Sequence, residues 1–409
     1  MPGPGYAFLG AEEAANVEAV LKDWHLTRYS YDVPETTSFV ARFEQAVQSM
    51  FDVPHAIGVN SGTSALITAL AALGVGPGDE VIVPGYTFIA SIGSIVYSGA
   101  TPVLAEIDES LTLSPEDVEA KITPRTKAIM AVHMLGAPCD LAALGEIAQR
   151  HGLALVEDVA QACGGSYRGR RLGTHGAAGA FSLNPFKVIT SGEGGFVLTS
   201  DAHLYQRAYS FQDQGWFPQR TDTGDGDILF GLNLRMPELS GAVACAQLDK
   251  LDGVLKATRA VKQAVASRIP ARDGLQRRTL HDAEGECGTL LVHVFDGADE
   301  AAAVADALGT KTMLGSGRHY YGNMSQLAAL TEGGTSPAPF RRPGSESQHD
   351  YRRGSLPRTD DVLARAVAIS IGVSDSYLGA GYGVTVQATE PDIERAADQF
   401  TATVDAVLG

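Results

Sequence analysis

Basic residues are scarce in this sequence, and they never gather into a run. The 409 residues include 31 Lys and Arg against 48 Asp and Glu, which gives a formal charge of −17 at pH 7. Proteins that bind nucleic acids need clustered lysine and arginine to neutralise the phosphate backbone. The acidic balance therefore argues against a nucleic-acid partner.

Cysteine is also rare, with four residues widely separated along the chain. None forms a C-x-x-C pair, and neither these cysteines nor the ten histidines show the spacing of metal ligands. We therefore expect no metal site. Scattered single cysteines are typical of buried, reduced thiols in a cytoplasmic protein.

A signal peptide and a long apolar run are absent as well. The first ten residues have neither a basic stretch nor an apolar core, so secretion is not expected. The most apolar segment, residues 86–100, is interrupted by three serines and is too short to span a bilayer. It predicts a buried helix, and the chain is expected to be cytoplasmic with no membrane partner.

Residues 51–200 alternate short β-branched runs with helical patterns, which is typical of parallel strands joined by crossover helices. The expected strands are residues 80–84, 128–134, 154–158, 178–183 and 195–199, and the expected helices include residues 63–73, 141–151 and 237–251. We predict an α/β fold: a large domain of residues 1–250 with a mostly parallel central sheet flanked by helices, and a smaller C-terminal α+β domain of residues 251–409. The Gly-, Ser-, Pro- and Arg-rich residues 332–353 predict a long loop.

One lysine stands in unusually apolar surroundings. In residues 181–192, Phe-Ser-Leu-Asn-Pro-Phe-Lys-Val-Ile-Thr-Ser-Gly, Lys187 is the only charged residue. Desolvation disfavours an ammonium ion and lowers its pKa, as an amine requires if it is to attack an aldehyde. The alternative is a lysine whose amine reaches solvent beyond an apolar stem, and this window alone does not decide between them.

Two further motifs suit the binding of a small ligand. An apolar strand ends in Glu157 and Asp158, followed by Gln161; acids at the carboxyl end of a parallel strand face the crevice where α/β sheets bind ligands. One of these carboxylates could pair with a protonated pyridine nitrogen, or both could lie in a solvated turn. Residues 60–64, Asn-Ser-Gly-Thr-Ser, open a helix whose free N–H groups suit a phosphate, although an ordinary N-cap looks similar.

Together these motifs resemble the DegT/DnrJ/EryC1/StrS family of fold type I aminotransferases, which install amines on keto-sugars and related cyclic ketones. The resemblance runs through residues 38–52, 60–66, 74–87, 123–136, 157–165, 181–195 and 233–251. It weakens after residue 251, although residues 356–365 still look like the family's C-terminal pattern. The resemblance implies the fold of the pyridoxal-phosphate-dependent transferases of type I.

The resemblance also implies the cofactor, pyridoxal 5′-phosphate, and a role for each matching residue. Lys187 would hold the cofactor as a Schiff base and shuttle a proton, and Asp158 would pair with the pyridine nitrogen. Gln161 would lie near the ring hydroxyl, and Phe88 would stack on the ring. Asn233 would reach in from a second subunit, which implies a homodimer with shared active sites. Gly62, Thr63 and Ser182 would bind the phosphate, and Ser64 is also expected among the cofactor-binding residues.

The leading hypothesis is transfer of an amino group from glutamate or glutamine to a nucleotide-linked keto-sugar or a cyclitol ketone. The main alternative is a lyase on the same scaffold. Dehydrating sugar relatives usually replace the lysine with histidine, so Lys187 argues against them, but an aromatising enzyme of the aminohydroxybenzoate-synthase type stays open. A non-catalytic binding protein would not need Lys187, Asp158 and Gln161 together.

Substrate contacts are expected in the C-terminal part, where the sequence departs most from common family members. Arg318, His319 and Tyr320 are the candidates there, and His133, near a strand end, is another. Each has a structural alternative: the first three could line a strand end, and His133 could be a core histidine with its hydrogen bonds satisfied.

Overall fold

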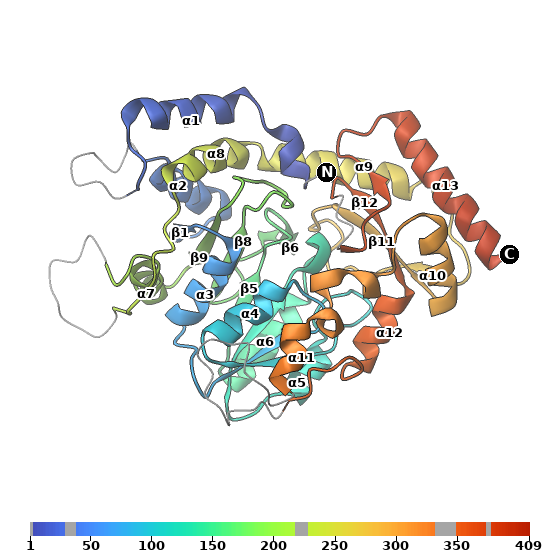
Figure 1. Cartoon of the computed structure of the whole chain (residues 1–409), viewed down its shortest axis with the longest axis horizontal. Helices are drawn as coiled ribbons and strands as arrows, with labels where there is room; N and C mark the ends of the chain where they lie inside the picture. The colour runs from blue at the N-terminus through green and yellow to red at the C-terminus, as the bar shows by residue number, and fades with distance from the viewer. Residues whose placement is uncertain (1–2, 29–37, 217–227, 332–348, 374–377) are drawn as a thin grey trace.

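The computed structural model describes residues 3–28, 38–216, 228–331, 349–373 and 378–409 (Figure 1). A seven-stranded sheet forms the centre of the larger part. Its strand order is β1 (His55–Val59), β9 (Gly195–Thr199), β8 (Ala178–Ser182), β5 (Ala154–Asp158), β4 (Thr126–Val132), β2 (Glu80–Pro84) and β3 (Thr101–Ala105). β9 runs antiparallel to both of its neighbours, and the other pairs are parallel, which confirms the mostly parallel sheet.

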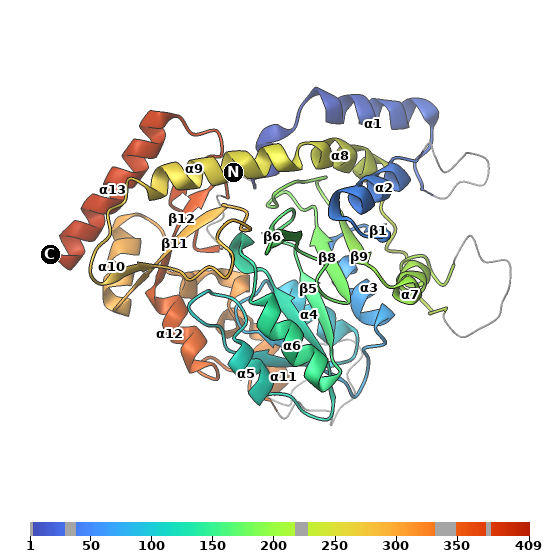
Figure 2. The same ribbon diagram turned by 180° about the vertical axis from the view of Figure 1, so that it is seen from behind.

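Helices cover both faces of this sheet, which explains why its strands are apolar on both sides (Figures 1 and 2). In β2, Val81 and Val83 belong to the core under one helical layer, and Ile82 belongs to the core on the other side. The first layer contains α3 (Gly62–Ala72), α4 (Ile89–Tyr97) and α7 (Ala202–Gln212). The second contains α2 (Phe39–Phe51), α5 (Pro115–Ala120), α6 (Leu141–His151) and α8 (Glu238–Asp249).

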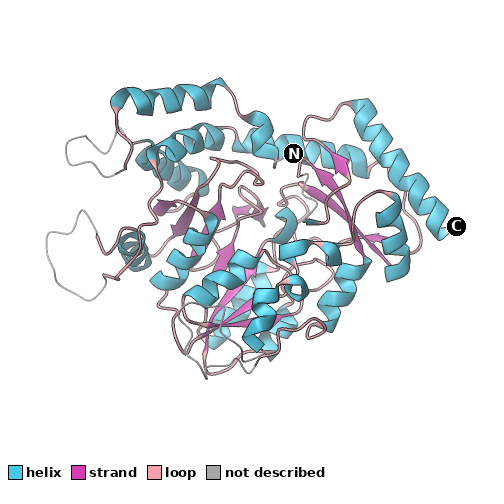
Figure 3. Ribbon diagram, viewed as in Figure 1, coloured by secondary structure: helices cyan, strands magenta, loops and turns pink. Residues whose placement is uncertain are grey.

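The smaller part is an α+β unit around a second sheet (Figure 3). Its strand order is β10 (Leu275–Arg277), β11 (Leu290–Phe295), β12 (Ala366–Ile371) and β13 (Gly383–Val384). Its helices are α10 (Ala298–Ala307), α11 (Ser325–Thr331), α12 (Pro357–Arg365) and α13 (Glu390–Leu408). The remaining elements are η1 (Pro4–Phe8), α1 (Ala11–Asp23), η3 (Met134–Gly136), β6 (Ser166–Tyr167), β7 (Arg170–Arg171), η4 (Met313–Gly315), η5 (Gly317–His319) and η6 (Tyr321–Asn323).

Helix α9 (Leu251–Ala266) connects the two parts (Figure 2). Its first turns contribute Leu251 and Val254 to the large core, whereas Val265 near its end belongs to the core of the small sheet. Helix α9 thus begins directly after the expected boundary between residues 250 and 251 and packs on both cores. The boundary itself stays a prediction.

The observed elements follow most of the expected ones. The segment 86–100 contains the buried helix α4, whereas the helix expected over 237–251 divides into α8 and α9 at Lys250. β4 begins two residues before the expected 128, and strands β1 and β3 were not predicted. Most of the expected loop 332–353 lies outside the described residues. None of the described helices is long and apolar enough to cross a membrane.

Candidate active site

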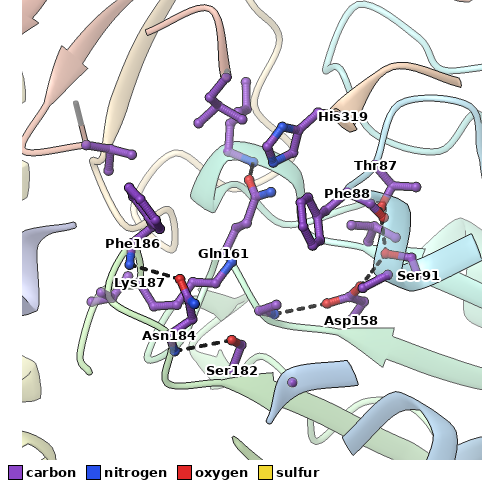
Figure 4. Close-up of a pocket in the computed structure, with 18 of the residues that line it drawn as sticks. Thr87, Phe88, Ser91, Asp158, Gln161, Ser182, Asn184, Phe186, Lys187 and His319 are labelled. Atoms are coloured by element: carbon purple, nitrogen blue, oxygen red, sulfur yellow. Dashed lines mark hydrogen bonds between the residues drawn. The ribbon is translucent and has the colours of Figure 1, made fainter. Parts of the chain in front are cut away.

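A cavity of about 320 Å³ opens where β5 and β8 end, between the large sheet and the small domain. Residues of both the larger and the smaller part line it (Figure 4). The predicted site residues that the structure brings together on this cavity are Gly62, Thr63, Phe88, Asp158, Gln161, Ser182, Lys187, Arg318 and His319. Among the described residues, no group of three His, Cys, Asp or Glu side chains is placed to hold a metal ion.

Lys187 lies on the loop that follows β8. Its backbone N–H donates to the carbonyl of Asn184 at 3.0 Å, and the Asn184 N–H donates to Ser182 Oγ at 3.3 Å. Thr190 Oγ1 closes the loop by donating to the Leu183 carbonyl at 2.9 Å. These local bonds fix a tight turn that brings Lys187 to the cavity (Figure 4).

The N-terminal segment closes over this lysine loop from outside. The Gly3 N–H donates to the Pro185 carbonyl at 2.8 Å, and Pro4 lines the cavity itself. The backbones approach so closely that a Cβ on Gly3 would lie 2.4 Å from the carbonyl carbon of Phe186. The segment Gly3–Pro4 is therefore a wall of the site that the sequence did not reveal.

We predict that Gly3→Ala weakens cofactor retention, because the added Cβ must displace either this segment or the lysine loop. Overpacking of this kind destabilises by about 1–3 kcal/mol. Equilibrium dialysis of pyridoxal 5′-phosphate measures the effect. Gly10→Ala is the matched control, since its Cβ would meet only the ends of movable side chains, the nearest being Glu12 Oε2 at 3.3 Å. Equal affinities of the two variants would contradict the predicted role of the segment.

Asp158 ends β5 and is 4% exposed. Its Oδ2 accepts a hydrogen bond from Ser91 Oγ at 2.7 Å, and its Oδ1 accepts one from the Ala160 N–H at 3.1 Å. Ser91 lies in the first turn of α4 and also lines the cavity. Sequence reasoning missed Ser91; the signal was a hydroxyl in the apolar segment 86–100, where the serines looked only like interruptions.

Gln161 follows Asp158 by three residues and lines the same cavity. Its Oε1 accepts the Leu135 N–H at 2.9 Å. Leu135 and the following Gly136 both have positive φ, at 60° and 77°, so the chain turns sharply beneath Gln161. The bond to this turn fixes the orientation of the Gln161 amide.

The start of α3 forms a cradle opposite the lysine loop. A Cβ on Gly62 would lie 2.5 Å from Ser182 Cβ, so only glycine allows the helix to begin against the end of β8. The first N–H groups of a helix lack intrahelical partners and attract an anion. Ser64 does not line this cavity: its Oγ donates to Asn60 Oδ1 at 2.6 Å as part of the cap that begins the helix.

These residues fit pyridoxal 5′-phosphate. The cradle at Gly62 and Thr63 suits a phosphate, the Asp158 carboxylate suits a protonated ring nitrogen, and Lys187 supplies an amine.

The small domain reaches the cavity through a backbone pairing with the loop after β2. The Thr87 N–H donates to the His319 carbonyl at 2.9 Å, and the Tyr321 N–H donates to the Gly85 carbonyl at 3.0 Å. As a result, the His319 ring centroid lies 5.1 Å from that of Phe88, and the Arg318 guanidinium carbon lies 5.2 Å from the Phe88 centroid.

Three other predicted residues do not line this cavity. Tyr320 is fully buried and donates to Asp360 Oδ1 at 2.8 Å. It therefore supports the backbone pairing with the loop after β2 and does not reach the cavity. His133 is also fully buried: its Nδ1 accepts the Cys139 N–H at 3.1 Å, and its Nε2 lies 3.1 Å from Glu157 Oε2. Asn233 is exposed and pairs with the backbone of Asp213, away from the cavity of its own chain.

Glu157 and Asp158 point to opposite sides of β5, as neighbours in a strand must. Glu157 is fully buried and accepts the N–H groups of Gly173 and His175 at 2.7 Å and of Gly176 at 2.8 Å. Burial opposes its ionisation, but the hydrogen bonds from His133 and from these amides outweigh burial and lower the pKa of Glu157. Glu157 therefore stabilises β5 on the side of the strand opposite Asp158.

We predict that Glu157→Gln lowers the free energy of unfolding by about 3–5 kcal/mol, because it removes one partner of a buried charged network. Thermal unfolding at neutral pH measures this, with Glu146→Gln, exposed on α6, as the control. Because folding lowers the pKa of Glu157, its contribution is present above the unfolded-state pKa and is lost as the pH falls through the folded-state pKa. The difference between wild type and variant should therefore shrink in acid; a constant difference would contradict the assignment.

Known proteins resemble this chain over most of its length. The model of the DegT/DnrJ/EryC1/StrS aminotransferase family matches residues 9–371. The chain belongs to this family. Aminotransferases of the family depend on pyridoxal 5′-phosphate, which confirms the expected cofactor.

Several relatives are named for specific reactions. A GDP-perosamine synthase of Caulobacter vibrioides is 43% identical over 231 residues, covering 54% of this chain and 60% of the relative. The chain thus matches about 60% of the length of such relatives. An L-glutamine:2-deoxy-scyllo-inosose aminotransferase of Streptomyces fradiae is 34% identical over 360 residues, covering 82% of this chain and 81% of the relative.

Solved structures of this fold match over the whole chain. DesV of S. venezuelae, determined in complex with a ketimine intermediate, is 31% identical, with a TM-score of 0.77 and 99% coverage of both chains. A 3-amino-5-hydroxybenzoic acid synthase is 26% identical, with a TM-score of 0.76 and 97% coverage of both chains. These likenesses confirm the family fold.

Proposed function

We propose that this family member transfers an amino group from glutamate or glutamine to a cyclic ketone, either a nucleotide-linked keto-sugar or a cyclitol. The observation that carries the proposal is the placement of Lys187 and Asp158 on one cavity whose other wall is the helix start at Gly62. The names of the relatives, a perosamine synthase and a scyllo-inosose aminotransferase, support the two acceptor classes.

When bound, the cofactor supplies an electron sink next to the donor's Cα–H bond. Lys187 takes the proton from that carbon and later returns a proton to the acceptor carbon, acting as base and then as acid. Asp158, held by Ser91 and the Ala160 N–H, would pair with the ring nitrogen and favour a positive charge there. Phe88 and Gln161, which line the same cavity, would help to hold the ring.

Arg318 and His319 are proposed to contact the substrates, because both reach the cavity from the small domain. An arginine beside the Phe88 ring suits the carboxylate of an amino-acid donor, which it can bind with two parallel hydrogen bonds.

The working unit is proposed to be a homodimer in which Asn233 completes the partner's site. Large apolar side chains near Asn233 are exposed, including Phe230 at 102% and Leu232 at 54%. Exposed apolar surface of this size suits a protein interface. Sedimentation should show a dimer. Mixed dimers of Lys187→Ala and Asn233→Ala chains should regain activity that neither variant has alone; failure to regain it would count against shared sites.

The transfer of label tests the function. Protein loaded with cofactor is given amino-¹⁵N-glutamate or glutamine and then a panel of keto-sugar nucleotides and keto-cyclitols. We expect the label in an amino product that retains the acceptor's oxygen count apart from the exchanged carbonyl. A product that has lost water without gaining label would instead establish the aromatising lyase, and no labelled product from any acceptor would overturn the proposal.

A further inference from the structure

Two hydroxyl groups form a chain that ends on Asp158. Thr87 Oγ1 and Ser91 Oγ are 2.7 Å apart, and Ser91 Oγ is 2.7 Å from Asp158 Oδ2 (Figure 4). All three residues are buried, with exposed fractions of 0%, 1% and 4%. The chain crosses from the loop after β2, through α4, to the end of β5.

The direction of these hydrogen bonds follows from the number of protons. An ionised carboxylate only accepts, so Ser91 must donate its single hydroxyl proton to Asp158. The bond between the two hydroxyls must then be donated by Thr87. Each donation polarises the next group, so both hydroxyl dipoles stabilise negative charge on Asp158.

Contacts at both ends hold these hydrogen-bonded hydroxyl groups in place. The Thr87 N–H is bonded to the His319 carbonyl, which anchors Thr87 to the small domain. The other oxygen of Asp158 is occupied by the Ala160 N–H. Among the described residues, the Phe88 carbonyl also accepts from the Thr87 hydroxyl, but it is farther away, at 3.5 Å.

We propose that Thr87 and Ser91 are positioning residues that hold the Asp158 carboxylate in the orientation in which it would pair with the pyridine nitrogen of the cofactor and keep a proton on that nitrogen. A hydrogen bond to a charged acceptor is short and about twice as strong as a neutral one, so loss of the Ser91 hydroxyl frees the carboxylate to turn. This inference rests on the proposed function, in which Asp158 faces that nitrogen.

Ser94 provides a matched comparison on the same helix. It is fully buried, and its Oγ donates to the Ser91 carbonyl at 2.7 Å, which is ordinary bonding to the preceding turn of a helix. Ser94 does not line the cavity. Ser94→Ala also removes a buried hydroxyl from α4, but it leaves Asp158 with both of its donors.

The test is a pH titration of the visible absorbance of the cofactor-loaded full-length protein. The midpoint is the pH at which the Lys187 nitrogen, joined to the cofactor, loses its proton. A positively charged cofactor ring repels that proton and therefore lowers the midpoint. We expect Ser91→Ala to raise the midpoint by about one pH unit and to lower kcat about tenfold, as the loss of one charge-assisted hydrogen bond predicts. Thr87→Val should raise the midpoint less, Thr87→Ser should restore it, and Ser94→Ala should leave it unchanged.

The outcomes separate this inference from the proposed function. If the wild type forms no absorbing linkage at Lys187, the proposed function itself fails. If the wild type titrates and Ser91→Ala and Thr87→Val keep its midpoint, or if Ser94→Ala shifts it equally, the positioning role is overturned. Thr87→Val still decides the matter if Ser91→Ala does not fold, since Thr87 does not touch Asp158.

Discussion

Replacement of Lys187 by alanine is expected to abolish amino transfer. The side chain has two tasks in the proposed chemistry: its amine joins the cofactor covalently, and it moves the proton between substrate carbon and cofactor. General acid–base catalysis alone contributes about 10²–10⁴-fold, so we expect kcat to fall by at least about ten-thousandfold when both tasks are lost. Steady-state transfer of labelled nitrogen measures this fall.

Two further variants make the Lys187 result specific. Lys187→Arg keeps a positive charge, but its guanidinium stays protonated and cannot attack an aldehyde, so it should be as inactive as the alanine variant. Lys256→Ala removes an exposed lysine from α9 and should retain full activity. If Lys187→Arg restored transfer, the lysine would contribute charge and not nucleophilic chemistry, and the assignment would be wrong.

Asp158→Asn is expected to have the second largest effect. Asparagine has nearly the same shape but no charge, so it cannot hold a proton on the ring nitrogen, and the stabilisation of negative charge during proton removal is lost. Removal of one electrostatic contact of this kind reduces kcat by about 10²–10³-fold. Rapid-mixing measurement of Cα-proton loss from the donor reports the affected step.

The Asp158 prediction has its own internal checks. Lys187 is intact in Asp158→Asn, so the covalent attachment of cofactor should persist while turnover falls. Asp249→Asn, exposed at the end of α8, should leave turnover unchanged. An Asp158→Asn enzyme with wild-type turnover would show that this carboxylate does not face the ring.

Much of the fold could be predicted because the strands under both helical layers are apolar throughout. β2 and β5 were placed at their observed bounds, since turn residues precede them. β1 was missed because His55 and Gly58 weaken its strand pattern, and only its pairing with β9 defines it. The antiparallel direction of β9 depends on that same pairing, which local sequence does not encode.

The site residues also divide into those that local sequence predicts and those that only distant contacts define. Lys187, Asp158 and Gly62 could be predicted because each belongs to a local motif with its own chemistry. Ser91 acts through a hydrogen bond to a residue 67 positions away, and Gly3 packs on the loop of Lys187. His133 shows the converse: its chemistry suited a substrate contact, but its partner Glu157 lies on the neighbouring strand and holds it in the core.

Borohydride reduction tests the central claim most directly. The purified protein is incubated with pyridoxal 5′-phosphate, reduced, digested and analysed by mass spectrometry. We predict that the cofactor is fixed on the peptide that contains Lys187 and on no other, and that prior addition of the true amino donor prevents the fixation. Cofactor attached to other lysines while Lys187 remains unmodified would contradict the account.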